Sequence, residues 1–128
     1  MVWYLDTSAF LKLVVVEEET AAMRRWFASH LPVWSSQLLQ TEARRAGTRL
    51  GLAPTVVDEA LDAVSLVLPT AGTFFLAGRL APPELRSLDA LHLAAAVELG
   101  DDLDGMVAYD DRLAAAARTR SITVVAPA

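Results

Sequence analysis

Four carboxylates stand where side chains of this sequence could do chemistry together. Asp6 directly follows the apolar run VWYL, and Asp110 follows the run MVAY. Asp89 lies in the apolar stretch LDALHLAAA, where an unpaired charge is costly, and Glu42 lies in TEARR. Like charges that the fold brings together raise one another's pKa values unless a cation binds among them, and no lysine or arginine is evident to neutralise them. Asp6 is therefore best explained as a metal ligand.

The types of ligand available restrict the metal. The sequence contains no cysteine, which excludes thiolate zinc sites, cysteine nucleophiles and disulfides. Carboxylate oxygens suit Mg²⁺ or Mn²⁺, which keep waters and bind substrate phosphates. We predict that Asp6 and Asp89 bind the ion directly and that Glu42 and Asp110 hold its waters or a second ion. Ser8, two residues after Asp6, is interpreted as a turn or cap residue whose hydroxyl could also orient a ligand or a bound water.

Each of these residues also has a structural interpretation. Asp6 and Asp110 could cap helices, although Asp111 is the better cap candidate for the helix that follows it. Glu42 could belong to a solvated helix face. His92, three residues after Asp89, could reach the same helix face, but we interpret it as a structural residue. The combination of acids, rather than any one of them, indicates a site.

Short β-branched or aromatic runs alternate with longer segments of helical period, which is typical of βα units on a parallel sheet. The expected strands are 2–6, 32–36, 65–70, 104–110 and 121–127. The expected helices are 8–16, 21–30, 37–52, 54–66, two short ones after residue 70, 85–99 and 111–120. In such a sheet the chemistry sits at the carboxyl edge of the strands. We therefore expect Asp6 and Asp110 on one edge, with Glu42 and Asp89 facing the same crevice.

Length and composition fit one α/β domain of 128 residues that is 54% hydrophobic. No apolar run is long enough to span a membrane and no basic signal region precedes Asp6, so we expect an intracellular, cytoplasmic protein. The net charge of −5 opposes an anionic partner. However, all the basic residues except Lys12 are arginines, which favours phosphate contacts, and we predict that Arg44, Arg45 and Arg112 bind RNA.

Four motifs together resemble the PIN-domain ribonucleases, and among them the VapC-type toxins of toxin–antitoxin pairs. The motifs are LDTSAF with Asp6, SSQLLQTEARR with Glu42, LDALHLAAA with Asp89, and YDDRLAAAAR with Asp110, followed by ITVVAP. Their order and spacing agree with the family from end to end. One position departs from the family pattern: relatives often carry Thr or Ser two residues before the fourth acid, where this sequence has Ala108. This departure leaves open how the fourth acid is held, and whether it is Asp110 or Asp111.

The resemblance implies a three-layer αβα sandwich with a central parallel sheet of four to five strands. It also implies a Mg²⁺- or Mn²⁺-dependent endoribonuclease, inhibited by a cognate VapB-type antitoxin and usually dimeric. Two alternatives remain open. One is a non-catalytic PIN-fold module that binds proteins, for which Ala108 is the only hint. The other is a phosphoaspartyl or receiver-like domain with Asp6 as nucleophile, which usually needs a lysine at a later strand end, whereas the sole lysine here is Lys12.

Overall fold

The computed structural model describes residues 1–128, in which five parallel strands form one sheet in the order β3-β2-β1-β4-β5. The strands are β1 (Val2–Leu5), β2 (Val33–Ser36), β3 (Ser65–Val67), β4 (Leu103–Val107) and β5 (Val124–Val125). The helices are α1 (Thr7–Val14), α2 (Thr20–Ser29), α3 (Leu38–Arg49), α4 (Pro54–Asp62), α5 (Ala71–Ala77), α6 (Ser87–Glu98) and α7 (Asp111–Thr119), with a 3₁₀ turn at Gly100–Asp102. The predicted parallel sheet of up to five strands is confirmed.

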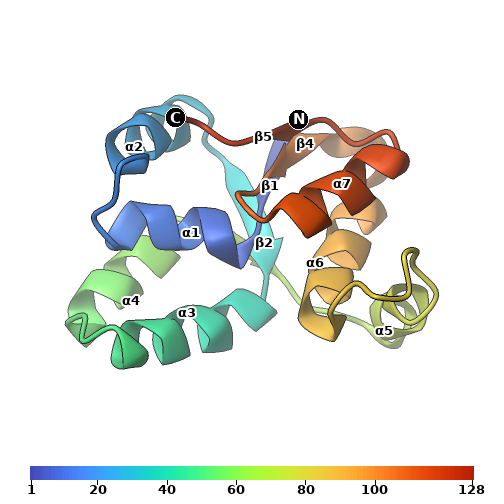
Figure 1. Ribbon diagram of the computed structural model, residues 1–128, viewed down its shortest axis with the longest axis horizontal. Coiled ribbons are helices and arrows are strands. Elements are labelled where there is room, and N and C mark those ends of the chain that lie inside the picture. Colours follow the sequence, from blue (N-terminus) through green and yellow to red (C-terminus); the bar gives the residue numbers. More distant parts are fainter.

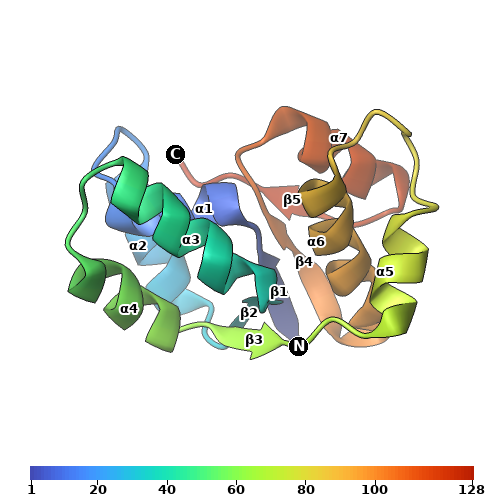
Figure 2. The ribbon, with the colours of Figure 1, turned by 90° about the horizontal axis from the view of Figure 1, so that it is seen from below.

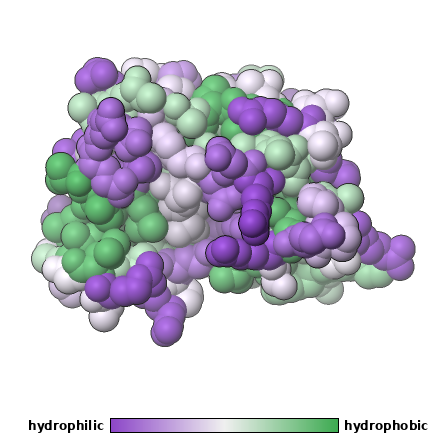
Figure 3. Space-filling model, in the orientation of Figure 1, coloured by the Kyte–Doolittle hydropathy of each residue, from purple (hydrophilic) through white to green (hydrophobic).

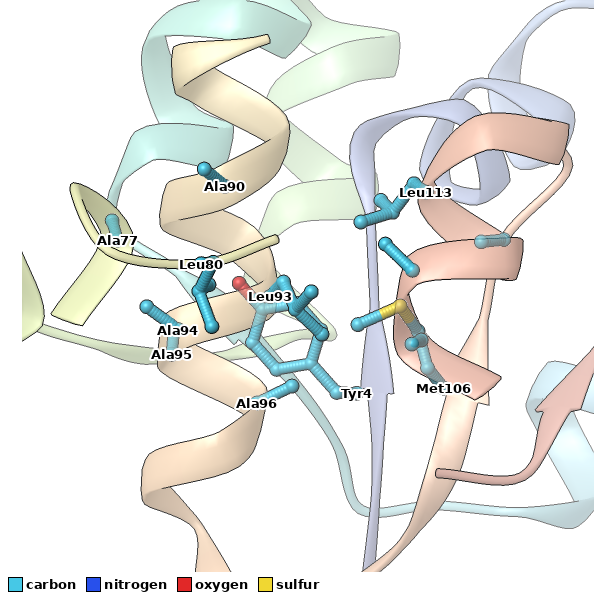
Figure 4. Close-up of a cluster of buried hydrophobic side chains, with 13 residues drawn as sticks. Tyr4, Ala77, Leu80, Ala90, Leu93, Ala94, Ala95, Ala96, Met106 and Leu113 are labelled. Atoms are coloured by element: carbon cyan, nitrogen blue, oxygen red, sulfur yellow. The ribbon is translucent and has the colours of Figure 1, made fainter. Parts of the chain in front are cut away.

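The helices cover both faces of the sheet, so the predicted three-layer arrangement is also confirmed. Helices α1–α4 lie on one side and α5–α7 on the other (Figures 1 and 2). Successive residues of a strand point to opposite faces, so Tyr4 packs in the core under α5–α7 and Leu5 packs in the core under α1–α4. Figure 4 shows Tyr4 reaching from β1 into the alanines of α6.

Some element bounds differ from the sequence prediction. Only one short helix, α5, follows residue 70, because the next segment contains Pro82 and Pro83 and forms no helix. Helix α4 ends at Asp62 rather than at residue 66, since Ser65 already pairs with Trp34 in the sheet. No helix combines the length and the apolar character needed to cross a membrane.

Candidate active site

The carboxyl edge of the sheet has a topological switch point between β1 and β4. The chain steps from β1 through β2 to β3 in one direction, and later places β4 and β5 on the other side of β1. Connections on the two sides of such a point leave the edge in opposite directions, which opens space for a site. Asp6 follows β1 and Asp110 lies in the connection after β4, so the two acids flank this point.

Asp6 is held by its own segment of chain. Its side chain is only 2% exposed and caps α1, with Oδ1 accepting from the Ala9 amide at 2.9 Å. The Ser8 hydroxyl donates to both carboxylate oxygens, at 2.7 and 2.8 Å. Burial nevertheless raises the pKa of Asp6 to about 6, with a further contribution from Asp89. Asp6 is thus both a helix cap and a carboxylate whose charge is poorly compensated.

Asp110, not Asp111, is the cap of α7, so the cap prediction for Asp111 is wrong. Asp110 has extended backbone, and its Oδ1 accepts from the Leu113 amide at 2.9 Å, whereas Asp111 is the first helical residue and is exposed. Strand β4 ends at Val107, so Asp110 does not end the strand as predicted. The cap bond answers the question raised by Ala108: a backbone amide of α7 holds Asp110.

The connection after β4 is also tied to Asp6. The Tyr109 amide donates to the Ser8 hydroxyl at 2.9 Å, and the same hydroxyl donates to Asp6. Ser8 therefore links the segment that carries Asp6 to the segment that carries Asp110. These bonds hold Asp6, and the role of Ser8 toward a ligand stays a prediction.

Glu42 lies in α3 and reaches a partner that the sequence analysis assigned only a structural role. Its Oε1 accepts from the Thr7 hydroxyl at 2.9 Å and lies 2.6 Å from Nε2 of His92. Burial alone would raise the pKa of Glu42, but His92 and Thr7 more than offset it and lower the pKa. Glu42 is 19% exposed and so does not belong to a solvated face. The signal in the sequence that His92 could reach the acids was its position three residues after Asp89, which places both residues on the same helix face.

Asp89 stands in the first turn of α6, half-buried, and accepts no hydrogen bond from the chain. Burial raises its pKa most, followed by the charge of Asp110, and Glu42 adds to the effect. His92 and Arg86 act in the opposite direction. Arg86, which directly precedes α6, is the one arginine whose charge acts on Asp89, but it forms no ion pair with Asp89 and the pKa of Asp89 stays raised.

The structure brings the charges of the acids near one another but does not arrange them as a closed metal cage. No three of the chain's carboxylate or imidazole groups are arranged as a complete ligand set around one point. Mg²⁺ does not require such a set, because it keeps several waters and takes one or two carboxylates. Asp89 raises the pKa of Asp6, and Asp110 and Glu42 raise the pKa of Asp89, which shows that negative charge accumulates here. This donor set fits Mg²⁺ or Mn²⁺.

Comparison with known proteins assigns the chain to a family. The model of the PIN domain matches residues 3–119. The chain belongs to the PIN domain family. Among curated relatives of this PIN domain, Ribonuclease VapC46 of Mycobacterium tuberculosis is 43% identical over 97% of this chain and 96% of its own length. Ribonuclease VapC47 and Ribonuclease VapC35 of the same species are 34% and 38% identical, each over 97% of this chain and 96% of its own length.

Solved structures share the fold of this PIN domain. Mycobacterium tuberculosis VapC20, described as a toxin that cleaves the sarcin-ricin loop, superposes with a TM-score of 0.77 at 20% identity. The alignment covers 98% of this chain and 99% of that one. VapBC2 from Rickettsia felis, bound to a DNA fragment from its promoter, gives a TM-score of 0.68 at 13% identity, with both chains fully covered. At these identities the likeness shows the fold.

Some basic side chains of this PIN domain are paired within the chain, and others have no partner in it. Arg44 is engaged by Asp58 at 3.1 Å and by Gln40, whereas Arg45 and Arg112 are exposed and hydrogen-bond no other group of the chain. Lys12 bonds Glu17 and Glu19 and lies over the ring of Tyr109. The sole lysine is thus committed to an ion-pair cluster away from the acids, which leaves a phosphoaspartyl site without its usual lysine.

Proposed function

We propose that this PIN domain is an endoribonuclease toxin of the VapC type that depends on Mg²⁺ or Mn²⁺. The observation that supports this most directly is the group of acids at the switch point, in which burial and neighbouring carboxylates raise the pKa values of both Asp6 and Asp89. Such a group attracts a divalent cation. Relatives named as VapC ribonucleases, similar over almost the whole chain, support RNA as the substrate.

In this proposal Asp6 and Asp89 hold the ion, and Glu42 and Asp110 hold its waters. When bound, the ion supplies an activated water and offsets negative charge on the phosphodiester. Ser8 keeps both oxygens of Asp6 in a fixed orientation through its two hydrogen bonds. Asp111, exposed beside Asp110, has a supporting role through its charge alone.

Arginines around the acids would bind the RNA backbone. Arg45 and Arg112 are exposed and free of partners within the chain, and Arg44 would exchange its ion pair with Asp58 for a phosphate. Arg86 joins this group because its charge already acts on Asp89. Guanidinium groups form bidentate contacts with phosphates, which positions a chain without reading its sequence.

The test is cleavage of total cellular RNA by the purified protein with Mg²⁺, with Mn²⁺ and with EDTA. We expect cleavage only with the metals, and products with 5′-phosphate and 3′-hydroxyl ends. Sequencing of the 5′ ends identifies the target. Absence of cleavage, together with absence of Mn²⁺ binding in a titration, would favour the non-catalytic module, and a trapped phosphoaspartate would favour the phosphoaspartyl enzyme.

The proposed partner is a VapB-type antitoxin in the cytoplasm, with this PIN domain as a homodimer. A surface hollow between residues 81–85 and α7, lined by Pro82, Leu85, Ala115 and Arg112 among others, could receive an apolar antitoxin segment. In Figure 3 hydrophilic residues gather near the centre of the face where α7 begins, with hydrophobic residues on both sides. An antitoxin arginine that reaches the acids would compete with metal, so excess Mg²⁺ should weaken antitoxin binding.

A further inference from the structure

His92 is a polar residue in a largely apolar helix. It lies in α6, and its side chain is 1% exposed. Its neighbours Leu93, Ala94 and Ala95 belong to the hydrophobic core under α5–α7. A buried imidazole without hydrogen bonds is destabilising in the low-dielectric interior, because its polar atoms lose their bonds to water. Both ring nitrogens of His92 do have partners, and these partners come from other elements.

The partners of His92 join three parts of the fold. Nδ1 lies 2.7 Å from the hydroxyl of Tyr4 on β1, and Nε2 lies 2.6 Å from Oε1 of Glu42 on α3. Figure 4 shows the Tyr4 hydroxyl directed toward α6. The Thr7 hydroxyl, at the start of α1, donates to the same Oε1 and lies 3.1 Å from Nε2. His92 is therefore the link between a core tyrosine and an acid of the proposed active site.

The Glu42 carboxylate fixes one proton in this chain of contacts. An ionised carboxylate only accepts hydrogen bonds, so Nε2 of His92 must carry the proton that is donated to Glu42. Burial raises the pKa of Tyr4, so its phenol keeps its proton. The phenol oxygen and Nδ1 lie 2.7 Å apart, and the phenol donates to a neutral imidazole or accepts from a protonated one. In both cases Tyr4 holds the ring from Nδ1 while Nε2 donates to Glu42.

Both donors act on one oxygen of Glu42 and leave the other free. Thr7 and His92 bond Oε1, whereas Oε2 accepts no hydrogen bond from the chain. A glutamate side chain loses rotamer freedom when it is held in one conformation. Here donors supplied by α1 and α6 fix the carboxylate in advance, with Oε2 available to the ion or its waters.

We propose that His92 is a positioning residue that orients the Glu42 carboxylate toward the metal site, with Tyr4 holding its ring from Nδ1. The inference rests on the proposed function, in which Glu42 acts near the ion. A purely structural histidine would stabilise the core and leave metal affinity unchanged. Groups that hold metal-site residues in place typically contribute about 10- to 100-fold to metal affinity or activity.

The test compares His92→Gln, His92→Asn and His92→Leu in the full chain. The glutamine amide can place an N–H near the position of Nε2, whereas the asparagine amide reaches only the position of Nδ1, and leucine has no donor. Mn²⁺ affinity is measured by calorimetry, and kcat and KM are measured separately on RNA. We expect the Leu and Asn variants to lose about 10- to 100-fold in kcat and in Mn²⁺ affinity with KM for RNA little changed, and Gln to restore most of both.

Folding is followed in every variant by circular dichroism and thermal melting. If His92→Leu does not fold, the comparison of His92→Gln with His92→Asn decides whether His92 positions Glu42. A Leu variant that folds and keeps wild-type Mn²⁺ affinity and kcat would overturn the proposal, and so would a Gln variant as impaired as the Asn variant.

A double substitution tests whether His92 acts through Glu42. In the Glu42→Gln background, His92→Leu should add no further loss of Mn²⁺ affinity, because the carboxylate that it orients is already gone. Additive losses would overturn the proposal. If the wild-type chain cleaves no RNA, the proposed ribonuclease function fails, but the series of Mn²⁺ affinities still decides the role of His92. If the wild-type chain binds no Mn²⁺, the proposal that His92 orients Glu42 toward a metal is wrong as well.

Discussion

The junction between β1 and α1 and the contact between α3 and α6 each hold a carboxylate, but by different means. Asp6 is held by Ser8 and Ala9, within three residues of itself. Glu42 is held by Thr7 and His92, which are 35 and 50 residues away in the sequence. The pKa of Asp6 is raised and that of Glu42 is lowered. Asp6 is the more deeply buried of the two, and its local donors and the charge of His92 do not offset that burial, whereas at Glu42 the hydrogen bonds from His92 and Thr7 do.

Loss of charge at the acids should have the largest effect, and it separates direct ligands from residues that hold waters. Asp6→Asn and Asp89→Asn should fold and reduce RNA cleavage to background, because each removes a charge expected at the ion with little change in volume. Glu42→Gln should lose about 10- to 100-fold, as for a residue outside the direct ligands. Rates measured on one RNA substrate check this, with the exposed Asp62→Asn as the matched control.

If Asp6→Asn or Asp89→Asn cleaved RNA at the wild-type rate, the assignment of direct metal ligands would be wrong. A loss at Asp62→Asn of the same size would show instead that any removal of negative charge disturbs the protein.

The pH dependence of stability should have opposite signs in the two regions. The pKa of Asp6 is about 6 in the folded protein and 3.8 unfolded, so its stabilising contribution is complete below pH 3.8 and is lost as pH rises through 6. Asp6→Asn avoids this loss and should gain up to about 3 kcal/mol over wild type well above pH 6. Glu42 contributes stability above its unfolded pKa, so Glu42→Gln should be destabilised there.

Urea unfolding of the three proteins without metal, at a series of pH values, measures these differences. Two variants with the same sign of pH dependence would show that the distant donors do not distinguish Glu42 from Asp6.

The junction between β4 and α7 extends the comparison to a second locally held acid. Asp110→Ala should lose the cap of α7 and about 1 kcal/mol of stability relative to Asp110→Asn, because asparagine also caps helices. Ala and Asn at Asp111 should differ by less than about 0.5 kcal/mol, since Asp111 is exposed and makes no cap bond. Equal differences at the two positions, measured by thermal unfolding, would contradict the assignment of the cap.

Arginines outside both regions should have the smallest effect on folding and act mainly on RNA binding. A triple variant carries glutamine in place of Arg44, Arg45 and Arg112. It should bind RNA more weakly. The slope of log affinity against log salt concentration should fall by about 1 for each phosphate that the protein no longer neutralises. Asp6→Asn, which removes no arginine, is the control for the slope. An unchanged slope in the triple variant would place the RNA path elsewhere, with Arg86 as the next residue to test.

Local patterns in the sequence determined most of the fold and the position of Asp6 at the end of β1. The alternation of short apolar runs with helical segments predicted the parallel sheet, because each βα unit carries its own hydrophobic period. Asp6, followed by two hydroxyls and a helix, could be interpreted from its neighbours alone, since its bonds reach no farther than Ala9. Such local signals do not fix exact ends, which is why β4 stops at Val107 and Asp110 rather than Asp111 caps α7.

Tertiary structure alone decided which residues complete the site. His92 meets Glu42 and Tyr4 only because α6 packs against β1 and α3 approaches from the other side. Glu42 is 50 residues and Tyr4 is 88 residues away from His92 in the sequence, and no spacing in the sequence encodes such contacts. The same holds for Arg86, whose charge reaches Asp89, and for the Tyr109 amide that bonds Ser8. The sequence by itself determined which acids stand at the sheet edge, because that depends on local backbone, whereas the packing of the helices decided how each acid is paired and protonated.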